Sequence, residues 1–531
     1  MKQLASLFTF SPRVLLAMSL SQNGESLRLW AGAPFASLRG AVFGGFMNKR
    51  NGSSSGLTRR QALVGVGAGA LAMTGCGGAD EANTDVGQAV ARRRVAIIGG
   101  GAGGIASAYF LDGTCDVTLF ESRAKLGGHC DSQLVTYQGE QLTLDLGAQF
   151  FHPATHPIYT ALLSELGLYD AARPDADQTL EAPGSVCVFA KNNLFPRFSS
   201  TAPYLTPFPA IDFLVYAQFA RQVILQNQSW ELTLSDFIGS LPVSQGFKDS
   251  VLFPWIAALI GTTHANAARS SARSILQTFA LAFPANPLEG ASTFNSKLGL
   301  EGNLEALLAR APGTLVQVNA GVQGLSYQNG VWTIQTANGP RGPFDAVVMN
   351  APPHTSSGLL SPLGWASDIV ALLKRYEYFD TRIVIHTDPV YADPLRSLWA
   401  VYNGEVDGSE CEGSVWLGGI HPKLANGKTV DIFKSWASHR SVESKHILLQ
   451  RNFRHPLITA DVIRAARSLA ATQGRNGLYF AGQHTTGFDL QEAAVYSAMK
   501  VAEKLAPTSP TLSALHSRLA STGQANVSYD L

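Results

Sequence analysis

The sequence predicts an α/β fold in which a dinucleotide-binding domain, built from separate chain segments, is interleaved with an α+β domain for the substrate. Two observations carry this prediction. Residues 94–121 read as strand, glycine turn, helix, strand and acidic residue, and a further strand–helix pair lies near the other end of the chain at 477–505. The 531 residues, 46% of them hydrophobic, suffice for cores of this size.

Composition and charge narrow the class of protein. The formal net charge is +1 and no long run of one sign occurs, so no nucleic-acid partner is expected. The five cysteines form no CxxC pair and show no zinc spacing, so no metal site is expected either. We therefore expect the partner to be a small-molecule substrate.

The N-terminal region has the features of an export signal. Arg59 and Arg60 precede a short apolar run that ends at Cys76, and this run is shorter than the ~20 residues that span a bilayer. The arginine pair resembles a twin-arginine signal, and the Met-Thr-Gly-Cys ending resembles a lipobox. We expect translation to start at Met47 and residues 58–76 to direct export. The mature protein would then be periplasmic, or a lipoprotein anchored to a membrane through Cys76. A buried helix rich in glycine and alanine is the alternative.

The first strand–helix–strand unit has the order of a Rossmann-like phosphate site. Residues 94–98 are an apolar run typical of a buried parallel strand. Residues 99–104 contain a GxGxxG pattern, a helical pattern follows over 105–111, and residues 116–120 read as a second strand that ends at Glu121. This complete context makes the motif far more specific than the glycines alone.

Each residue of this motif has a physical role in the prediction. Gly99 permits the tight turn, Gly101 lets the backbone approach a pyrophosphate, and Gly104 lets the helix pack closely on the strand. Free N–H groups at the start of the helix would bind the phosphates. Glu121 stands where an acidic residue accepts hydrogen bonds from the ribose hydroxyls.

A second glycine motif distinguishes between dinucleotides. Residues 122–129 read Ser-Arg-Ala-Lys-Leu-Gly-Gly-His, which resembles the second glycine motif of the flavin amine oxidase superfamily. In that superfamily the motif wraps the FAD pyrophosphate, and simple NAD dehydrogenases have no counterpart. The resemblance therefore implies FAD. His129 stands where the family usually has arginine, so one phosphate contact is altered.

The resemblance continues in the same order along the chain. Residues 144–151 resemble the Asp-x-Gly-Ala segment that lies near the flavin ring. Residues 315–318 and Val322 resemble the strand that borders the adenine, and residues 345–353 resemble the strand and proline-rich turn that return to the FAD domain.

The last motif lies at 477–494. A strand ends in Ala481 and Gly482, and residues 492–494 open a helix. In the family this pair holds the ribityl chain and the pyrimidine edge, where a helix N-terminus stabilises the anionic reduced flavin. Gln483 replaces the usual acid. No cysteine or histidine lies in a recognisable attachment motif, so non-covalent FAD is expected. The residues assigned to FAD are Gly99, Gly101, Ala102, Gly103, Gly104, Glu121, Ser122, Arg123, Gly127, Gly128, His129, Gly147, Ala148, Gln149, Val322, Gly482, Gln483, Glu492, Ala493 and Ala494.

The motif order gives a domain plan in which two domains alternate along the chain. The FAD-binding two-dinucleotide-fold domain takes three segments, and the α+β substrate domain takes the two between them. The plan is signal and linker 1–93, FAD-binding 94–155, a mostly helical substrate part 156–305, FAD-binding 306–353, a substrate-domain sheet 354–470, FAD-binding 471–506, and a C-terminal tail 507–531.

One branch of the superfamily resembles the chain more closely than the amine oxidases do. Residues 126–129, 385–389, 399–403 and 453–456 resemble bacterial FAD/NAD-binding proteins often encoded beside cyclopropane-fatty-acid synthases. The amine oxidase lysine at flavin N5 has no counterpart over 379–383, and Leu490 and Gln491 stand where an aromatic cage residue would precede the final glutamate. An amine would lose its usual clamp.

These departures favour a flavin oxidoreductase that transfers hydride from a small or apolar organic substrate, such as a lipid or an isoprenoid, to flavin N5. An amine or amino-acid oxidase with an altered cage is one alternative, and an electron-transfer or non-catalytic flavoprotein is another. The sequence does not identify the electron acceptor. His484 is the candidate catalytic residue, since histidine can exchange a proton near neutral pH. Other polar groups expected near the flavin or on a substrate-domain strand are Gln149, His152, His386, Asp388 and His455; each histidine could instead be purely structural.

Overall fold

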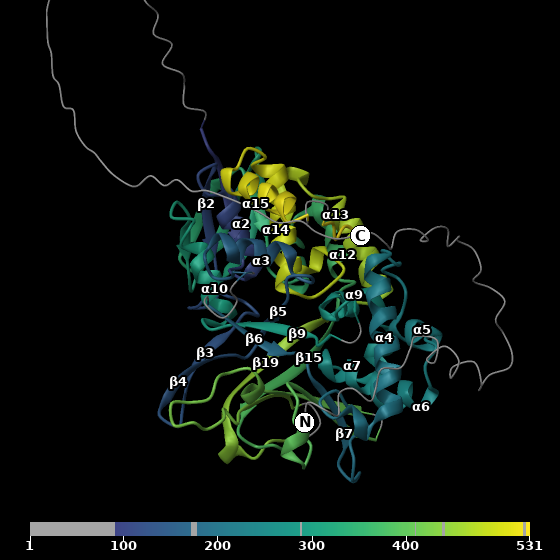
Figure 1. The fold of residues 1–531 in the computed structure, drawn as a ribbon. Coiled ribbons are helices and arrows are strands. Elements are labelled where there is room, and N and C mark those ends of the chain that lie inside the picture. The colour runs from purple at the N-terminus through teal and green to yellow at the C-terminus, as the bar shows by residue number, and fades with distance from the viewer. Residues whose placement is uncertain are drawn as a thin grey trace, which may run out of the picture. The chain divides into compact units, whose positions relative to one another are not determined.

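The dinucleotide fold is centred on a parallel sheet of five strands (Figure 1). Its order is β10 (Leu315–Gln317), β2 (Cys115–Phe120), β1 (Arg93–Ile98), β14 (Ala346–Met349) and β20 (Leu478–Phe480). These strands come from three distant parts of the chain, and their apolar runs are buried because both faces of the sheet are covered. The predicted α/β class with a two-dinucleotide fold is confirmed.

The computed structural model describes residues 91–170, 172, 178–286, 289–408, 410–437, 441–523 and 527–531. The predicted start at Met47, the signal at 58–76 and the anchor at Cys76 lie outside these residues. Within the described part of the chain, no helix combines the length and the apolar character needed to cross a bilayer.

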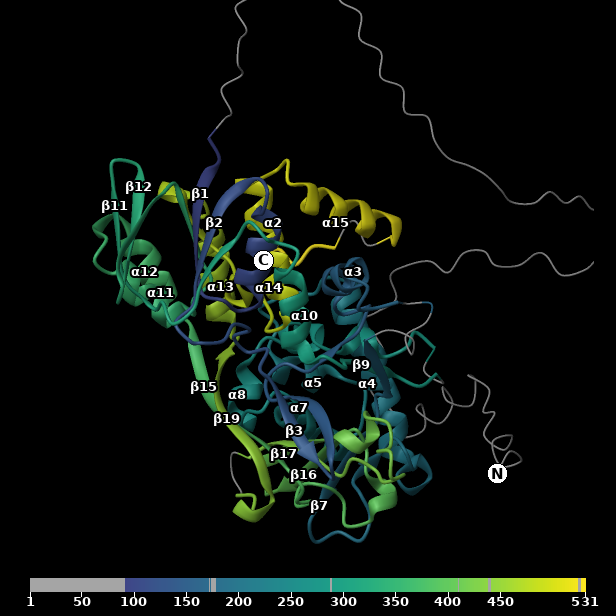
Figure 2. The same ribbon diagram turned by 90° about the vertical axis from the view of Figure 1, so that its left-hand side faces the viewer.

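Two helices from opposite ends of the chain pack on this sheet. Helix α2 (Ala102–Leu111) follows β1, and helix α14 (Gln491–Leu505) follows β20. Both views of the whole fold place them side by side (Figures 1 and 2). Helix α10 (Gly299–Leu308) also packs against α2. Because α2 and α14 each begin at the carboxyl edge of the sheet, their N-termini come together there.

The dinucleotide core takes in more of the chain than the domain plan gives it. Helix α3 (Pro157–Glu165) packs on α14, and α10 on α2. Buried side chains of helices α11 (Pro353–Leu360), α12 (Ser367–Leu373) and α13 (Ala460–Ala470) also belong to this core. Chain order assigned these helices to the substrate domain, but their apolar faces are buried against the dinucleotide fold. A three-stranded antiparallel sheet of β11 (Val322–Gln328), β12 (Val331–Thr336) and β13 (Gly339–Phe344) stands beside them.

The substrate domain is built on a seven-stranded sheet. Its order is β19 (Ile447–Leu457), β15 (Glu377–His386), β18 (Phe433–Trp436), β17 (Glu410–Trp416), β16 (Tyr402–Asp407), β7 (Val186–Ala190) and β8 (Phe198–Ser199). Strands β15 and β19 are the long pair that runs down from the dinucleotide fold (Figure 2). Smaller sheets are formed by β3 (Ser132–Tyr137) with β4 (Glu140–Asp145), and by β5 (Phe150–Phe151), β9 (Ser292–Ser296) and β6 (Thr179–Pro183).

A helical layer covers this sheet and forms its own apolar core. The long helix α4 (Pro207–Leu225) packs on α9 (Ala272–Gln277), and α7 (Phe253–Leu259) packs on β17. The layer also contains α5 (Leu234–Ser240), α6 (Gln245–Phe247), a π-helical turn over Lys248–Leu252, α8 (His264–Arg269) and the 3-10 turn η5 (Ala280–Ala282).

The C-terminal segment is packed, whereas the domain plan gave residues 507–531 as a tail. Helix α15 (Pro510–Ser521) lies against α2 and α3, and its Leu512, Leu515 and Leu519 are buried. Beyond it, Tyr529 is buried against the ring of Phe488 at 4.7 Å. These leucines are spaced so that they share one face of a helix. This spacing could have predicted a packed helix in place of a tail.

Candidate active site

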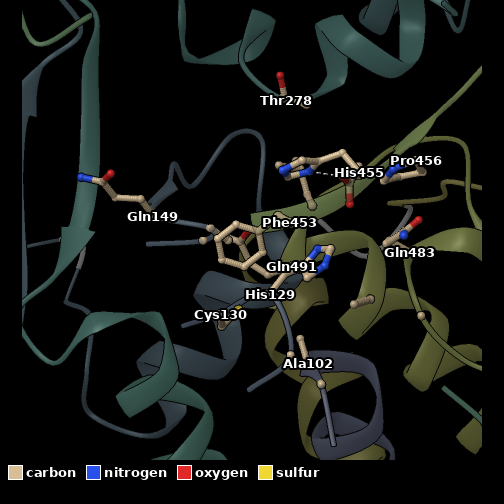
Figure 3. A pocket seen from close by; sticks show the side chains of 18 of the residues that line it. Ala102, His129, Cys130, Gln149, Thr278, Phe453, His455, Pro456, Gln483 and Gln491 are labelled. Atoms are coloured by element: carbon tan, nitrogen blue, oxygen red, sulfur yellow. Dashed lines mark ion pairs between the residues drawn. The ribbon is translucent and has the colours of Figure 1, made fainter. Parts of the chain in front are cut away.

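A cavity of about 790 Å³ lies where the dinucleotide fold meets the substrate sheet and the helical layer. Part of its lining comes from all three FAD-binding segments, including both glycine motifs, and part comes from α7, α9 and β15. Figure 3 shows side chains from both parts facing the same space, with Ala102 on one side and Thr278 opposite it. The cavity therefore has two parts: one lined by the glycine motifs, and one lined by the helical layer and the substrate sheet.

The first glycine motif leaves the start of α2 open. Gly101 is the N-cap residue, and no side chain of the described residues caps the helix or places an acid in its first turn. A Cβ on Gly103 would come within 2.5 Å of Asn350 Oδ1. A Cβ on Gly104 would lie 2.0 Å from the Gly99 carbonyl, so this glycine lets α2 sit on β1 and does not line the cavity. Asn350, which sequence reasoning did not single out, lines the cavity and donates from Nδ2 to Gly99 O (2.9 Å).

Glu121 joins the two glycine motifs. Its Oε2 accepts from Gly100 N and its Oε1 from Arg123 N, both at 2.8 Å. Gly101 and Gly127 form a parallel bridge, so the second motif lies directly on the first. Ser122, Arg123, Gly127, Gly128 and Val322 line the same part of the cavity.

His129 faces the cavity at the end of the second motif. Its ring lies 5.4 Å from the Phe453 ring and 5.6 Å from the His455 ring (Figure 3). Desolvation lowers the pKa of His129, with Asp489 opposing the shift, so the ring is neutral near pH 7. A neutral imidazole at this position would give a cofactor phosphate one hydrogen bond without the charge that the family's arginine carries.

A buried lysine supports the segment predicted to lie near the flavin ring. Lys434, on β18, donates from Nζ to Gly147 O and lines the cavity. Burial lowers the pKa of Lys434 to about 8, with Asp145 opposing the shift, and burial raises the pKa of Asp145 to about 6. The sequence analysis did not identify Lys434. A lysine next to Phe433 within a short strand was the one sign that its amine is buried.

Several polar atoms in the lining have no hydrogen-bond partner among the described residues. They include Gln149 Oε1, Gln483 Oε1 and His484 Nε2. Buried polar atoms are normally paired, so these atoms indicate a polar ligand. Together with the glycine cradle and the open start of α2, they fit a dinucleotide cofactor. Gly147, Ala148, Gly482 and Ala494 line the same region.

Glu492 and Ala493 lie elsewhere, in contrast to the sequence-based assignment. Glu492 is completely buried and accepts from Ile158 N (3.0 Å), Tyr159 N (2.7 Å) and Tyr529 Oη (3.1 Å). It therefore caps helix α3, and neither it nor Ala493 lines the cavity. One residue earlier, Gln491 does line it and donates to Phe150 O (2.8 Å). Consecutive side chains in a helix point in different directions, so Gln491 faces the cavity while Glu492 faces helix α3.

The histidines separate into cavity and core groups. His484 lines the cavity between the rings of Tyr376 and Phe480, and burial lowers its pKa to about 4, so it is neutral. His455 also lines the cavity, with Nδ1 3.6 Å from Asp489 Oδ2 (Figure 3). His386 is buried in the sheet, where its Nε2 lies 2.8 Å from Ser435 Oγ, and it does not line the cavity.

His152 lines the cavity, and burial lowers its pKa to about 4. Asp388 accepts from Val390 N in the turn after β15 and lies away from the cavity.

The far end of the cavity is mainly apolar. Its lining comes from α7, α9, η5 and the sheet, and the only acidic residues that the described cavity wall contains are Glu121 and Asp489. Glu121 is bound in the glycine motifs, and Asp489 pairs with His455. The principal apolar residues are Trp255, Leu259, Ile275, Phe279, Phe283 and Ile383.

Comparison with known proteins agrees with this arrangement. The sequence profile of the flavin containing amine oxidoreductases matches residues 102–385, more than half of the chain. A coproporphyrinogen III oxidase of Staphylococcus aureus is 35% identical over 107 residues, which cover 20% of this chain and 21% of that protein. The match thus spans about a fifth of that relative's length.

Solved structures share the fold at low identity. A fatty acid isomerase from P. acnes that produces CLA has a TM-score of 0.56 at 14% identity, with 77% of this chain and 98% of that chain covered. A putrescine oxidase variant has a TM-score of 0.52 at 14% identity, with 78% and 99% covered. The sequence profile and the glycine cradle together place the chain in the family of flavin containing amine oxidoreductases, as a flavin-dependent oxidoreductase.

Proposed function

We propose that the protein binds FAD without a covalent bond and oxidises an apolar organic substrate, such as a lipid or an isoprenoid, by hydride transfer to flavin N5. The observation that carries the substrate class is the apolar end of the cavity, where Ile275, Phe279 and Phe283 form the wall. The flavin would supply the redox chemistry, and the protein would supply binding, orientation and exclusion of water.

The chain's own groups suit these tasks. The open start of α2 would hold the pyrophosphate, since free N–H groups and the helix dipole favour a negative charge. Helix α14 begins at Gln491 without a side-chain cap, and Gln491 lines the cavity, so its N-terminus can stabilise charge on the pyrimidine edge. His455, paired with Asp489, has the geometry to exchange a proton inside the cavity.

Amine oxidation is less well supported. A protonated amine would need an anionic partner; of the two acidic residues of the described wall, Glu121 is bound in the glycine motifs and Asp489 lies 3.6 Å from His455. The buried Lys434 would also repel a cationic substrate below its pKa of about 8. A fatty acid isomerase and a putrescine oxidase share the fold, so the fold alone does not choose between these substrate classes.

The cofactor proposal predicts a yellow protein whose flavin is released on unfolding. We expect the purified protein to show an oxidised-flavin spectrum. Denaturation and filtration should pass all of the flavin into the filtrate, where chromatography would identify FAD. Flavin retained with the denatured chain would contradict non-covalent binding, and FMN in the filtrate would contradict FAD.

The substrate proposal is tested by anaerobic reduction of the bound flavin. We expect unsaturated fatty acids or isoprenoids to bleach the flavin, and primary amines and amino acids to leave it oxidised. Phe283→Asp should slow bleaching by the apolar substrate about tenfold, because a charge in the cavity wall opposes an apolar ligand. Leu134→Asp, at an exposed position on β3, is the matched control and should leave the rate unchanged. Bleaching by amines alone would establish the amine oxidase alternative, and no bleaching by either class would favour the electron-transfer one.

We further propose that the protein is exported by the twin-arginine pathway and anchored through Cys76. In a bacterial host, release from the membrane fraction should require detergent for the natural protein and only a high-salt wash for Cys76→Ala. Replacing Arg59 and Arg60 with lysine should keep the protein in the cytoplasm, because the pathway reads the arginine pair. Identical extraction of the natural and Cys76→Ala proteins would refute the anchor.

A further inference from the structure

An exposed apolar patch lies at the start of helix α4. Phe208 in its first turn is 80% exposed and Ile211 is 43% exposed, while Tyr204 just before the helix is 75% exposed. Leu194 and Phe195, in the turn between β7 and β8, are 81% and 55% exposed. We call these five residues the α4 patch. Single exposed apolar side chains are ordinary, but a cluster of large ones marks an interaction site.

Strand β8 connects the two halves of the patch. Strand β8, which follows the turn, contacts both α4 and the 3-10 turn at Pro203–Leu205. On the inner side, Phe198 of β8 stacks on Phe213 of α4 with ring centroids 4.6 Å apart. The turn and the helix therefore present their apolar tips from one packed unit. Figure 1 shows α4 on the side of the fold away from β3 and β4.

The charge of this region is complementary to an anionic surface. Residues 191–225 contain three basic residues and one acidic residue, a net charge of +2. Lys191 and Arg197 flank the apolar tip of the turn; Lys191 is exposed, whereas Arg197 is half-buried and donates to Ser250 O at 3.2 Å. Arg221 lies further along α4 and is also half-buried. The single acid, Asp212, already accepts a hydrogen bond from Ser244 Oγ at 2.6 Å. Basic residues around apolar and aromatic tips are the composition of an element that lies in a membrane interface.

Helix α4, which carries part of the patch, packs directly on the apolar end of the cavity. Phe213, on the inner face of α4, is 5.5 Å from Trp255 and 5.8 Å from Phe283, and both of these residues line the cavity. Arg221 donates to the Phe283 carbonyl, which fixes α4 to this wall. After Phe283 the chain continues into the exposed Ala285. One helix therefore separates the exposed patch from the substrate end.

We propose that the α4 patch inserts into the headgroup region of an anionic lipid bilayer, so that the apolar end of the cavity lies next to the membrane. Aromatic and aliphatic tips would enter the interface, and the exposed Lys191 would contact lipid phosphates. This peripheral contact is separate from a lipid anchor, and it holds for whichever substrate the flavin oxidises. It would deliver a membrane-dissolved molecule to the cavity without passage through water.

The test is co-sedimentation of the full chain with vesicles. Every protein carries Cys76→Ala, which removes the proposed lipidation site. We expect binding to vesicles of phosphatidylcholine with phosphatidylglycerol, weaker binding to phosphatidylcholine alone, and at least tenfold weaker partitioning for Phe208→Glu with Ile211→Glu. Leu134→Glu is the matched control, because Leu134 is 72% exposed on β3, and it should bind like the parent. The flavin spectrum and thermal unfolding of each variant verify that the fold is kept.

Three outcomes would overturn the proposal. Failure of the parent to bind any vesicle would show that the patch does not enter a bilayer. Equal binding of the parent and the double variant would place the lipid contact elsewhere in the chain. A dimer that Phe208→Glu dissociates, without vesicle binding, would show that a second copy covers the patch.

Discussion

Gly101→Val is expected to abolish flavin binding while the protein remains folded. A Cβ at this position would lie 3.5 Å from Asn350 Nδ2 and 3.7 Å from Gly128 Cα, which are ordinary contacts. The backbone is extended, with φ −79° and ψ −176°, and suits valine. The added methyl groups would instead occupy the space between the two glycine motifs, where a pyrophosphate must approach the backbone.

We expect at least a hundredfold loss of FAD affinity, about 3 kcal/mol, measured by titrating the apoprotein with FAD. Thermal unfolding without flavin should change little. Gly358→Ala is the matched control, because Gly358 is exposed on α11 and a Cβ added there would meet no atom within 4 Å. It should keep its flavin and gain about 0.5–1 kcal/mol of stability. Recovery of Gly101→Val with a full complement of flavin would show that the phosphates bind elsewhere.

Glu492→Ala is expected to destabilise the fold by about 4 kcal/mol, because three buried donors would lose their acceptor and each such loss costs about 1–3 kcal/mol. These donors are Ile158 N, Tyr159 N and Tyr529 Oη. The measurement is denaturant unfolding of the apoprotein. Tyr529→Phe removes one of the three bonds and should cost about 1 kcal/mol. Loss of FAD affinity with unchanged stability would instead support a direct role of Glu492 in cofactor binding.

The same carboxyl group makes stability depend on pH. Burial raises the pKa of Glu492 from 4.5 to about 7. The folded protein therefore holds this proton more tightly than the unfolded chain, and the stability that Glu492 contributes falls as pH rises from about 4.5 to 7 and then levels off. His152, His386 and His484, whose pKa values are lowered by burial to about 4, act in the opposite direction. The contribution of Glu492 is about 3 kcal/mol.

Asp145, with its pKa raised to about 6, acts in the same direction, so Glu492→Gln is needed to isolate the effect. The free energy of unfolding of the natural protein, minus that of Glu492→Gln, should fall by about 3 kcal/mol as pH rises across this range. A constant difference would show that Glu492 does not titrate there.

Local patterns in the sequence were sufficient to predict the dinucleotide fold. The apolar runs of β1, β2, β14 and β20 indicated buried parallel strands because such strands are covered on both faces. Gly104 could be assigned to helix–strand packing for a local reason, since helix α2 directly follows the strand that it packs against. These inferences depended only on residues close together in the chain.

Contacts between distant segments were not predictable in this way. Glu492 and Gln491 are neighbours in a helix, and which of them faces the cavity depends on where α3 and Tyr529 lie. Lys434 became a cavity residue because β18 pairs with β15 and brings its amine to Gly147, 287 positions earlier. Helices α3, α10 and α15 joined the dinucleotide core because their apolar faces fit there, and an amphipathic pattern does not specify its partner.

The sequence by itself thus determined the fold class, the glycine motifs and the flavin family, because these depend on local backbone geometry and on short apolar runs. Only the tertiary structure decided which histidines reach the cavity, which carboxylate is structural and where the apolar patch lies against the cavity wall. Those properties depend on the packing of segments that are hundreds of residues apart, and side-chain burial there is set by the assembled core.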